Sequence, residues 1–260
     1  MDPRLERIHA FSRGILERSS TLELEHSFGT AYFNEHFPQI WDMNYLLVDG
    51  TPEIDERKLI EEAEELHSRL GHSHRQICFE HLEAAPRGGW MERAGYTRER
   101  ILWMVHENDT ARLENARPAV ELEPHESRVA RASYWKSTPS APATQQLVDK
   151  IEVTAKATDL LIFGSMDDGQ VVSVCDLYSD GRTAQVEDVI TLEDYRGRGH
   201  ATSTVASAVR HAKETGHELV FLIADSEDWP RHLYAALGFE GIGEGCDFLK
   251  TPSTTRKGPA

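Results

Sequence analysis

The sequence predicts a mixed α/β fold in which helices and strands alternate. Short apolar runs of strand length, such as ELVFLIADS (218–226), alternate with longer segments of helical periodicity. Several of the helical segments end at a glycine, and the turns DDG and SDG join three consecutive apolar strands. The chain has 260 residues, 39% hydrophobic and 28% charged, so it is long enough for one large domain or two small ones.

The first half predicts the order strand, helix, strand, helix, strand. An apolar run, NYLLVDG (44–50), precedes a clear amphipathic helix at 56–71, which Gly71 is placed to end. A strand at 74–81 follows, and segment 89–107 contains a short helix, a Gly-Tyr break and another strand. Because residues 108–117 are polar and lack periodicity, they are the best linker in the sequence.

The second half predicts a strand, two helices and then three strands joined by short turns. The helices are separated by the loop STPSAPAT, whose prolines and small polar residues disfavour regular structure. In order, these elements are expected at 118–125, 127–137, 144–158, 159–166, 170–181 and 183–192. This arrangement predicts an antiparallel meander after the two helices.

The chain then predicts helix, buried strand, helix and a last strand. The helix behind residue 200 has one apolar face and ends at Gly216, and a second helix, WPRHLYAALG, ends at Gly238 with Asp228 as a plausible cap. The final strand covers FEGIGEGCDFLK. We therefore expect an N-terminal domain at 1–112, a second domain at 117–250 and a disordered tail at 251–260.

The two halves share the order strand, loop, helix, glycine, strand, helix, Gly-aromatic, strand. The distance from Gly71 to Gly95 is 24 residues, and that from Gly216 to Gly238 is 22 residues. This similarity favours a duplication of one unit. The first copy has the acidic stretch DGTPEIDE where the second copy has a basic glycine loop, so the two halves are not expected to bind the same ligand.

Composition restricts the partners. A formal net charge of −16 argues against binding nucleic acid or an anionic membrane, and it favours a cationic or amine partner weakly. The N-terminus lacks the apolar core of a secretion signal, and no uncharged run is long enough to span a bilayer, so the cytoplasm is the expected location. A monomer or a homodimer is expected.

No metal is expected from the sequence. Cys78, Cys175 and Cys246 lie far apart without CxxC spacing, which suits a reducing compartment and predicts small core residues in place of a zinc site. His72 and His74 are two residues apart, and the sequence supplies no obvious third ligand beside them.

The segment YRGRGHAT (195–202) has the features of a phosphate-binding loop. Gly197 and Gly199 remove side-chain bulk, the following helix presents unpaired N–H groups, and two arginines supply positive charge. A dinucleotide fingerprint would need a third glycine where Thr202 stands, and the Gly-Lys-Ser/Thr of a Walker A loop is missing. A flexible turn is the simpler alternative.

The pattern Arg196-x-x-Gly199-x-Ala201, followed by the helix ending LYAALGF, resembles the acetyl-CoA-binding core of the GNAT family of N-acyltransferases. The resemblance covers about residues 184–240 and extends loosely back to 117. It implies the GNAT fold, an α+β arrangement with a central, mixed, mostly antiparallel twisted sheet flanked by helices. The N-terminal half would then be a smaller, degenerate GNAT-like domain without a pyrophosphate loop.

The resemblance also implies where acetyl-CoA would bind. Two neighbouring parallel strands of a GNAT domain part, and the pantetheine arm pairs with the backbone of the first, here Val189, Ile190 and Thr191. The pyrophosphate would lie on backbone N–H groups of the loop that follows. The residues of that loop are Arg196, Gly197, Arg198, Gly199, His200, Ala201 and Thr202.

Two residues are implied as catalytic. Tyr234 stands where the family usually has a tyrosine that protonates or hydrogen-bonds the CoA sulfur, although it could be a core aromatic. The usual glutamate position is Gln185, so Glu187, two residues on and on the same face, is the candidate base or amine-binding group. An exposed strand residue is the alternative for Glu187.

The acceptor pocket is expected to include Asp176, Tyr178 and Asp225. Glu227 stands where the family often has an asparagine, which weakens the expected contact with the cofactor arm. The predicted function is transfer of an acetyl group from acetyl-CoA to a primary amine of a small molecule or peptide. A non-catalytic acyl-CoA-binding module, another acyl-CoA and an oxygen acceptor remain alternatives.

Overall fold

The computed structural model describes residues 2–50, 53–136 and 140–252. The expected disordered tail lies almost wholly outside this range, as do three residues of the predicted loop between the two helices. The helices are α1 (Pro3–Ser19), η1 (Trp41–Met43), α2 (Glu56–Arg69), α3 (Trp90–Arg93), α4 (Ala111–Glu114), α5 (Pro124–Trp135), α6 (Ala141–Ala157), η2 (Glu193–Tyr195), α7 (His200–Glu214) and α8 (Pro230–Ala236). The strands are β1 (Leu22–His26), β2 (Gly29–Phe33), β3 (Tyr45–Val48), β4 (Arg75–Phe79), β5 (Thr97–His106), β6 (Val120–Leu122), β7 (Asp159–Asp167), β8 (Gln170–Ser179), β9 (Thr183–Thr191), β10 (Leu219–Asp225) and β11 (Phe239–Lys250).

The chain forms two compact units that do not follow its order. Unit 1 contains residues 1–19 and 101–243, and unit 2 contains residues 20–100 and 244–260. The boundary expected at 112–117 therefore does not separate them. The reason is that both β5 and β11 are long strands that begin in one unit and end in the other.

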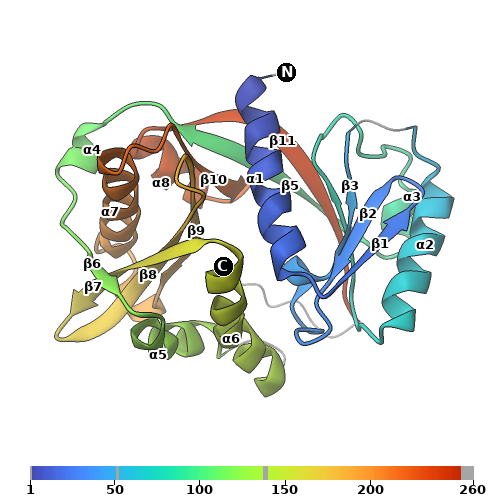
Figure 1. Ribbon diagram of the computed structural model, residues 1–260, viewed down its shortest axis with the longest axis horizontal. Helices are drawn as coiled ribbons and strands as arrows, with labels where there is room; N and C mark the ends of the chain where they lie inside the picture. The colour runs from blue at the N-terminus through green and yellow to red at the C-terminus, as the bar shows by residue number, and fades with distance from the viewer. Residues whose placement is uncertain (1, 51–52, 137–139, 253–260) are drawn as a thin grey trace. The chain divides into compact units, whose positions relative to one another are not determined.

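Unit 1 is a mixed, mostly antiparallel sheet in the order β5-β10-β9-β8-β7-β6. Only β9 and β10 pair in parallel, as the helix α7 crossing between them requires. Helices α7 and α8 bury one apolar face of the sheet, in a cluster that includes Leu177, Val186 and Val205. Helix α1 and the α5–α6 pair cover the opposite face (Figure 1). The predicted fold class is thus confirmed.

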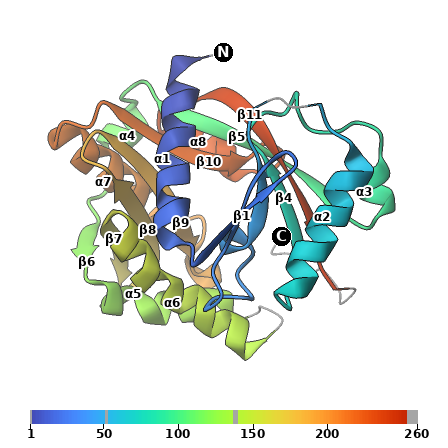
Figure 2. The ribbon, with the colours of Figure 1, turned by 45° about the vertical axis from the view of Figure 1, so that its right-hand side comes forward.

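Unit 2 repeats this pattern with fewer strands. Its strands run in the order β1-β2-β3-β4-β11, and only β3 and β4 are parallel. Helix α2 lies along these strands (Figure 2) and buries Leu59 and Ala63 against them. Asp55 is the N-cap residue of this helix, and its side chain accepts hydrogen bonds from the backbone N–H groups of Arg57 and Lys58.

The last strand of each half of the chain pairs inside the unit of the other half. In unit 1, β10 pairs antiparallel with β5, which comes from the first half, so that Phe221 faces Val105. In unit 2, β4 pairs antiparallel with β11, which comes from the second half, so that Phe79 faces Cys246. This exchange is consistent with the predicted duplication.

Several elements were not anticipated from the sequence. Helix α1, which has 17 residues, and the short hairpin β1–β2 lie outside the repeated pattern. Asp228 does not cap α8, whose cap position is Trp229; its carboxylate accepts a hydrogen bond from the Trp229 N–H at 2.7 Å. Cys175 and Cys246 are fully buried, as expected of core residues, whereas Cys78 is only half-buried. No helix in the described part of the chain is long and apolar enough to cross a membrane.

Replacing Gly238 by alanine should destabilise unit 1 strongly. Gly238 has φ of +96°, and a Cβ there would lie 1.8 Å from the carbonyl oxygen of Asn108. Backbone strain and this clash together should lower the free energy of unfolding by about 3 kcal/mol or more. Urea denaturation measures the change.

Gly216→Ala is the matched control, because Gly216 has φ of +86° but open space where the Cβ would stand. It should cost only about 1–2 kcal/mol of conformational strain. Equal losses in the two variants would contradict the proposed clash.

Candidate active site

The parallel strands β9 and β10 part at the middle of the sheet. Their register runs from Thr183 opposite Leu219 to Val186 opposite Leu222 and stops there. Beyond that point β10 continues beside β5 to Asp225, while β9 continues beside β8 to Thr191. The two strands therefore separate, leaving an opening flanked by the backbone of β9 beyond Val186.

A β-bulge in β9 lies at this opening. Glu187 faces Asp176 of β8 and Ile190 faces Val174, so two residues of β9 stand opposite the single Cys175. The first of the two, Asp188, has φ of +47°, in the left-handed region that only a few per cent of non-glycine residues adopt. The bulge turns the end of β9 away from the direction of its first half.

Buried cations hold the bulge in place. Arg131 of α5 is 1% exposed, donates to the carboxylate of Asp176 and lies 3.1 Å from Asp188. Lys150 of α6 lies 3.5 Å from Asp188 on its other side. Burial alone would raise the pKa of Asp188, but Lys150 and Arg131 outweigh it and hold that pKa below its ordinary value. Two basic and two acidic side chains thus pair with one another inside the protein.

The glycine loop leads into the N-terminus of α7. Gly197 and Gly199 have φ of +75° and +86°, and Gly199 is the residue immediately before the helix. The first backbone bond in α7 runs from the Ser203 N–H to the Gly199 carbonyl at 3.0 Å. The N–H groups of residues 200–202 precede it and point toward the loop, as an anion site requires.

The side chains of the loop are partly engaged. Arg198 donates to the Asp194 carbonyl at 2.8 Å and lies 3.6 Å from Asp167, whereas Arg196 makes one long contact of 3.4 Å with the Thr191 carbonyl. His200 is buried, and its Nδ1 lies 2.8 Å from Ser165 Oγ. A cavity of about 160 Å³ borders this end of α7 and is lined by Arg117, Ser165, Arg198, Gly199, His200 and Ser203, among others.

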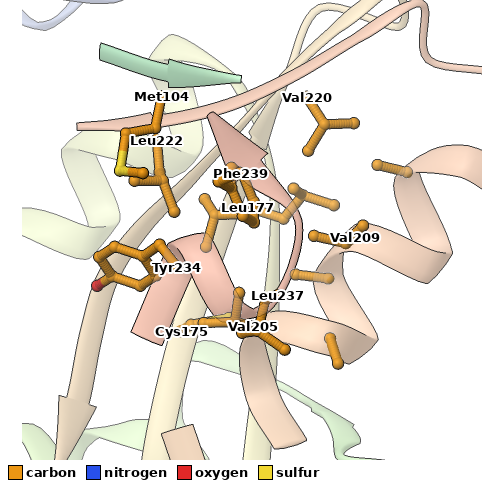
Figure 3. Close-up of a cluster of buried hydrophobic side chains, with 14 of the residues drawn as sticks. Met104, Cys175, Leu177, Val205, Val209, Val220, Leu222, Tyr234, Leu237 and Phe239 are labelled. Carbon is orange, nitrogen blue, oxygen red and sulfur yellow. The ribbon is translucent and has the colours of Figure 1, made fainter. Parts of the chain in front are cut away.

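Tyr234 lies at the edge of the apolar cluster beneath α7 and α8. Its hydroxyl points away from the other members of the cluster (Figure 3), and its ring packs edge-on near Phe239. Burial, and after it the charge of Glu187, raise its pKa well above the ordinary value. The phenol is therefore protonated throughout the neutral range and can act as a proton donor.

Glu187 reaches the opening from the opposite face of the sheet, the face covered by α5 and α6. Its carboxylate accepts a 2.6 Å hydrogen bond from the Gln185 amide, so the residue at the usual glutamate position orients it. Burial first, and the neighbouring Asp188 second, raise the pKa of Glu187 to about 7. A carboxylate with this pKa can accept a proton near neutral pH.

The expected acceptor residues are not equivalent. Asp176 is 1% exposed and paired with Arg131, so it contributes to the ion cluster, and Tyr178 is also buried. Asp225 is exposed at the end of β10 and accepts a hydrogen bond from the Glu227 N–H at 2.7 Å. Their roles toward an acceptor stay predictions.

Arg131, Lys150 and Ser226 were missed by sequence reasoning. The Ser226 hydroxyl is buried beyond β10, and no hydrogen-bond partner for it is found among the described residues. Arg131 and Lys150 lie on helices far from the loop in sequence, and an arginine or lysine in a helix ordinarily faces water. A serine that follows a strand, such as Ser226, likewise gives no sequence signal of a functional role.

Comparison with known proteins agrees with this geometry. Residues 128–239 match the family model described as the acetyltransferase (GNAT) family. A functionally unknown conserved protein from Staphylococcus epidermidis has a TM-score of 0.70 at 15% identity, with 87% of this chain and 92% of that chain covered. A GCN5-related N-acetyltransferase from Kribbella flavida has a TM-score of 0.64 at 18% identity, with 95% of both chains covered.

A third structure has two such domains. It is a tandem GNAT protein from the clavulanic acid biosynthesis pathway, with a TM-score of 0.52 at 17% identity and coverage of 80% of this chain and 76% of that one. At these identities the solved structures establish the fold alone. No curated protein sequence matches the chain.

Arg131→Met should destabilise the protein by about 3–5 kcal/mol, because it removes the buried partner of the Asp176 and Asp188 carboxylates. Urea denaturation at neutral pH measures the loss.

Arg128→Met in the same helix is the control. Arg128 pairs with Asp149 at the surface, where both side chains are about one-third exposed, so its loss should cost less than about 1 kcal/mol. Similar losses in the two variants would show that the buried cluster does not bind Arg131 as described.

Proposed function

Residues 128–239 form a domain of the GNAT acetyltransferase family, and from this premise we propose that the chain transfers the acetyl group of acetyl-CoA to a primary amine. The family supports acyl transfer in general. Acetyl-CoA as the donor and an amine as the acceptor are our proposal. The net charge of −16 favours a cationic small molecule or peptide over an acidic acceptor.

The observation that carries the proposal is the opening between β9 and β10, with Glu187 and Tyr234 on its two faces. A thioester held in the opening would have a carboxylate of pKa about 7 on one side and a protonated phenol on the other. Direct transfer to an amine needs these two groups, one to take a proton from the nucleophile and one to give a proton to the leaving thiolate.

The acceptor amine would attack the thioester carbonyl directly. Glu187 would remove a proton from the attacking nitrogen, directly or through water, so that the new C–N bond forms without a build-up of positive charge. As the C–S bond breaks, Tyr234 would donate its proton to the thiolate. Its hydroxyl, once deprotonated, is unstable in this buried position, which favours rapid return of the proton from solvent.

The loop before α7 suits the phosphates of CoA. A Cβ on Gly197 or Gly199 would meet no atom within 4 Å, so the space in front of the loop is open. Positive φ at both glycines aims the backbone at one side, and the helix terminus adds a partial positive charge. The backbone of Val189, Ile190 and Thr191 would pair with the pantetheine arm.

A non-catalytic acyl-CoA-binding module is a second candidate, favoured by Gln185 at the usual position of the base. Such a module would bind acetyl-CoA but release no free CoA in the presence of any acceptor. Release of thiol over a panel of amines and alcohols, monitored with a thiol reagent, separates the two candidates. The same panel tests oxygen acceptors and longer acyl chains.

Arg196→Ala should weaken acetyl-CoA binding by about tenfold or more, because a charge-assisted contact with a phosphate contributes about 1.5–3 kcal/mol. Isothermal titration calorimetry measures the dissociation constant. Arg182→Ala is the control, since Arg182 is an exposed arginine of the same unit that pairs with Glu218. No measurable binding by the wild type, or equal effects of the two substitutions, would refute the loop as the phosphate site.

Glu187→Gln should remove the basic step from the pH profile. In the wild type, kcat/KM should rise with pH until about 7, where Glu187 loses its proton, and then level off. The variant should be slower by about 10²–10⁴-fold at pH 8 and lack this rise. Steady-state kinetics from pH 5.5 to about 9 measures both effects.

The stability of this variant separates catalysis from folding. The pKa of Glu187 is raised in the folded state, so its stabilising effect is complete below the ordinary value of 4.5 and is lost as the pH rises through about 7. Removing the charge should therefore leave the melting temperature at pH 8 unchanged or higher. Glu214→Gln, at an exposed position in α7, should leave activity unchanged. An unaltered pH profile in Glu187→Gln would exclude it as the base.

A further inference from the structure

Three histidines gather inside unit 2, far in sequence from the glycine loop. His67 lies in the last turn of α2, His72 follows the helix, and His74 immediately precedes β4. Their exposed fractions are 0%, 6% and 0%. One ring nitrogen of each lies within 4.8 Å of those of the other two.

The end of α2 brings the first two together. Gly71 has φ of +72°, the Gly71 N–H bonds the Ser68 carbonyl at 3.0 Å, and the His72 N–H bonds the His67 carbonyl at 2.9 Å. This is a Schellman motif, whose two flanking side chains are usually apolar and touch each other. Here both are imidazoles, and their Nδ1 atoms lie 3.1 Å apart.

One ring nitrogen of His74 is buried without a hydrogen-bond partner among the described residues. Its Nε2 lies 3.1 Å from the Asn44 carbonyl, which can only accept, so Nε2 carries the proton. The Nδ1 lone pair is then unprotonated, buried, and without a hydrogen-bond partner among the described residues. A histidine that donates one N–H to a backbone carbonyl while its other nitrogen stays free is oriented as metal ligands usually are.

We propose that His67, His72 and His74 form a binding site for a divalent transition-metal ion of the zinc type. Imidazole nitrogen is a preferred ligand of Zn²⁺, at about 2.0–2.1 Å, and three such ligands leave a fourth position for water. Ligands at that distance lie about 3.4 Å apart in a tetrahedron. The three nitrogens would therefore close in by no more than about 1.5 Å, through small rotations of the rings.

The surroundings of the three histidines suit a metal ion and show which contacts the ion would replace. Burial lowers the pKa of His67 to about 2 and that of His74 to about 4, so these rings are neutral, the form that binds a metal. The metal would displace the contact between His67 and His72 and, at most, the long 3.4 Å contact from the Gln76 N–H to His67 Nε2. Phe33 packs beside the His67 and His72 rings. Arg75 is a nearby cation, and its guanidinium pairs with Glu64 and donates to the carbonyls of His72 and His74.

The test is metal binding by the full chain, stripped with a chelator and then titrated with Zn²⁺ in competition with a chromophoric indicator. We expect one ion per chain with a dissociation constant below about 1 μM, and weakening of about tenfold or more in His67→Gln and in His74→Gln. Zinc should also raise the melting temperature of the wild type and leave that of His74→Gln unchanged.

His26→Gln is the matched control, because the His26 side chain is 1% exposed and lies in the same unit outside the cluster. It should bind zinc as the wild type does. Co²⁺ in the unmutated chain gives an independent readout: visible d–d bands of a four-coordinate site without thiolate charge-transfer bands support the proposal, even where a variant fails to fold. No stoichiometric zinc, zinc binding unaltered by both cluster substitutions, or the spectrum of hexa-aquo Co²⁺ would overturn it.

Discussion

The left-handed aspartate in β9 is the constraint on which the candidate active site depends. Asp188 could relax into an ordinary strand conformation, but it would then break its buried ion pairs with Arg131 and Lys150. Its strain costs about 1–2 kcal/mol, whereas breaking a buried ion pair costs about 3–5 kcal/mol. The pairing therefore prevails, the bulge persists, and β9 turns away from β10. The opening between these strands follows from charges on helices α5 and α6, which precede β9 in sequence.

The same charges set the chemistry at the opening. Asp188 is beside Glu187 in the chain, and its negative charge adds to burial in raising the pKa of Glu187. Lys150 acts in the opposite direction, so the pKa comes to about 7 instead of rising further. Geometry and protonation are thus coupled: a change that releases Asp188 from its cations would move the strand and the pKa of the candidate base together.

Sequence patterns predicted the order of elements well, because glycine stops and apolar periodicity are local signals. They also placed the glycine loop at 195–202 before a helix, since the spacing of glycines and apolar residues carries that information, while the roles of Glu187 and Tyr234 stay predictions. The exchange of β5 and β11 could not be predicted, because an apolar strand does not specify its partner. The buried pairing of Arg131 was equally hidden, since its three-dimensional neighbours lie 45 and 57 residues away. The third histidine escaped for a similar reason: His67 reaches His72 only through the left-handed glycine at 71.

The two units show why similar topology need not mean similar function. In unit 1 the parallel pair β9–β10 ends its register early, and the strands part before the glycine loop. In unit 2 the parallel pair β3–β4 stays in register to the last residue of both strands, with Val48 opposite Phe79, and the Glu80 N–H extends it by bonding the Val48 carbonyl at 3.4 Å. Over the described residues β3 contains no residue of positive φ like Asp188. A strand pair that stays closed offers no free backbone to a pantetheine arm, and the acidic segment DGTPEIDE that follows it differs from the basic loop of unit 1.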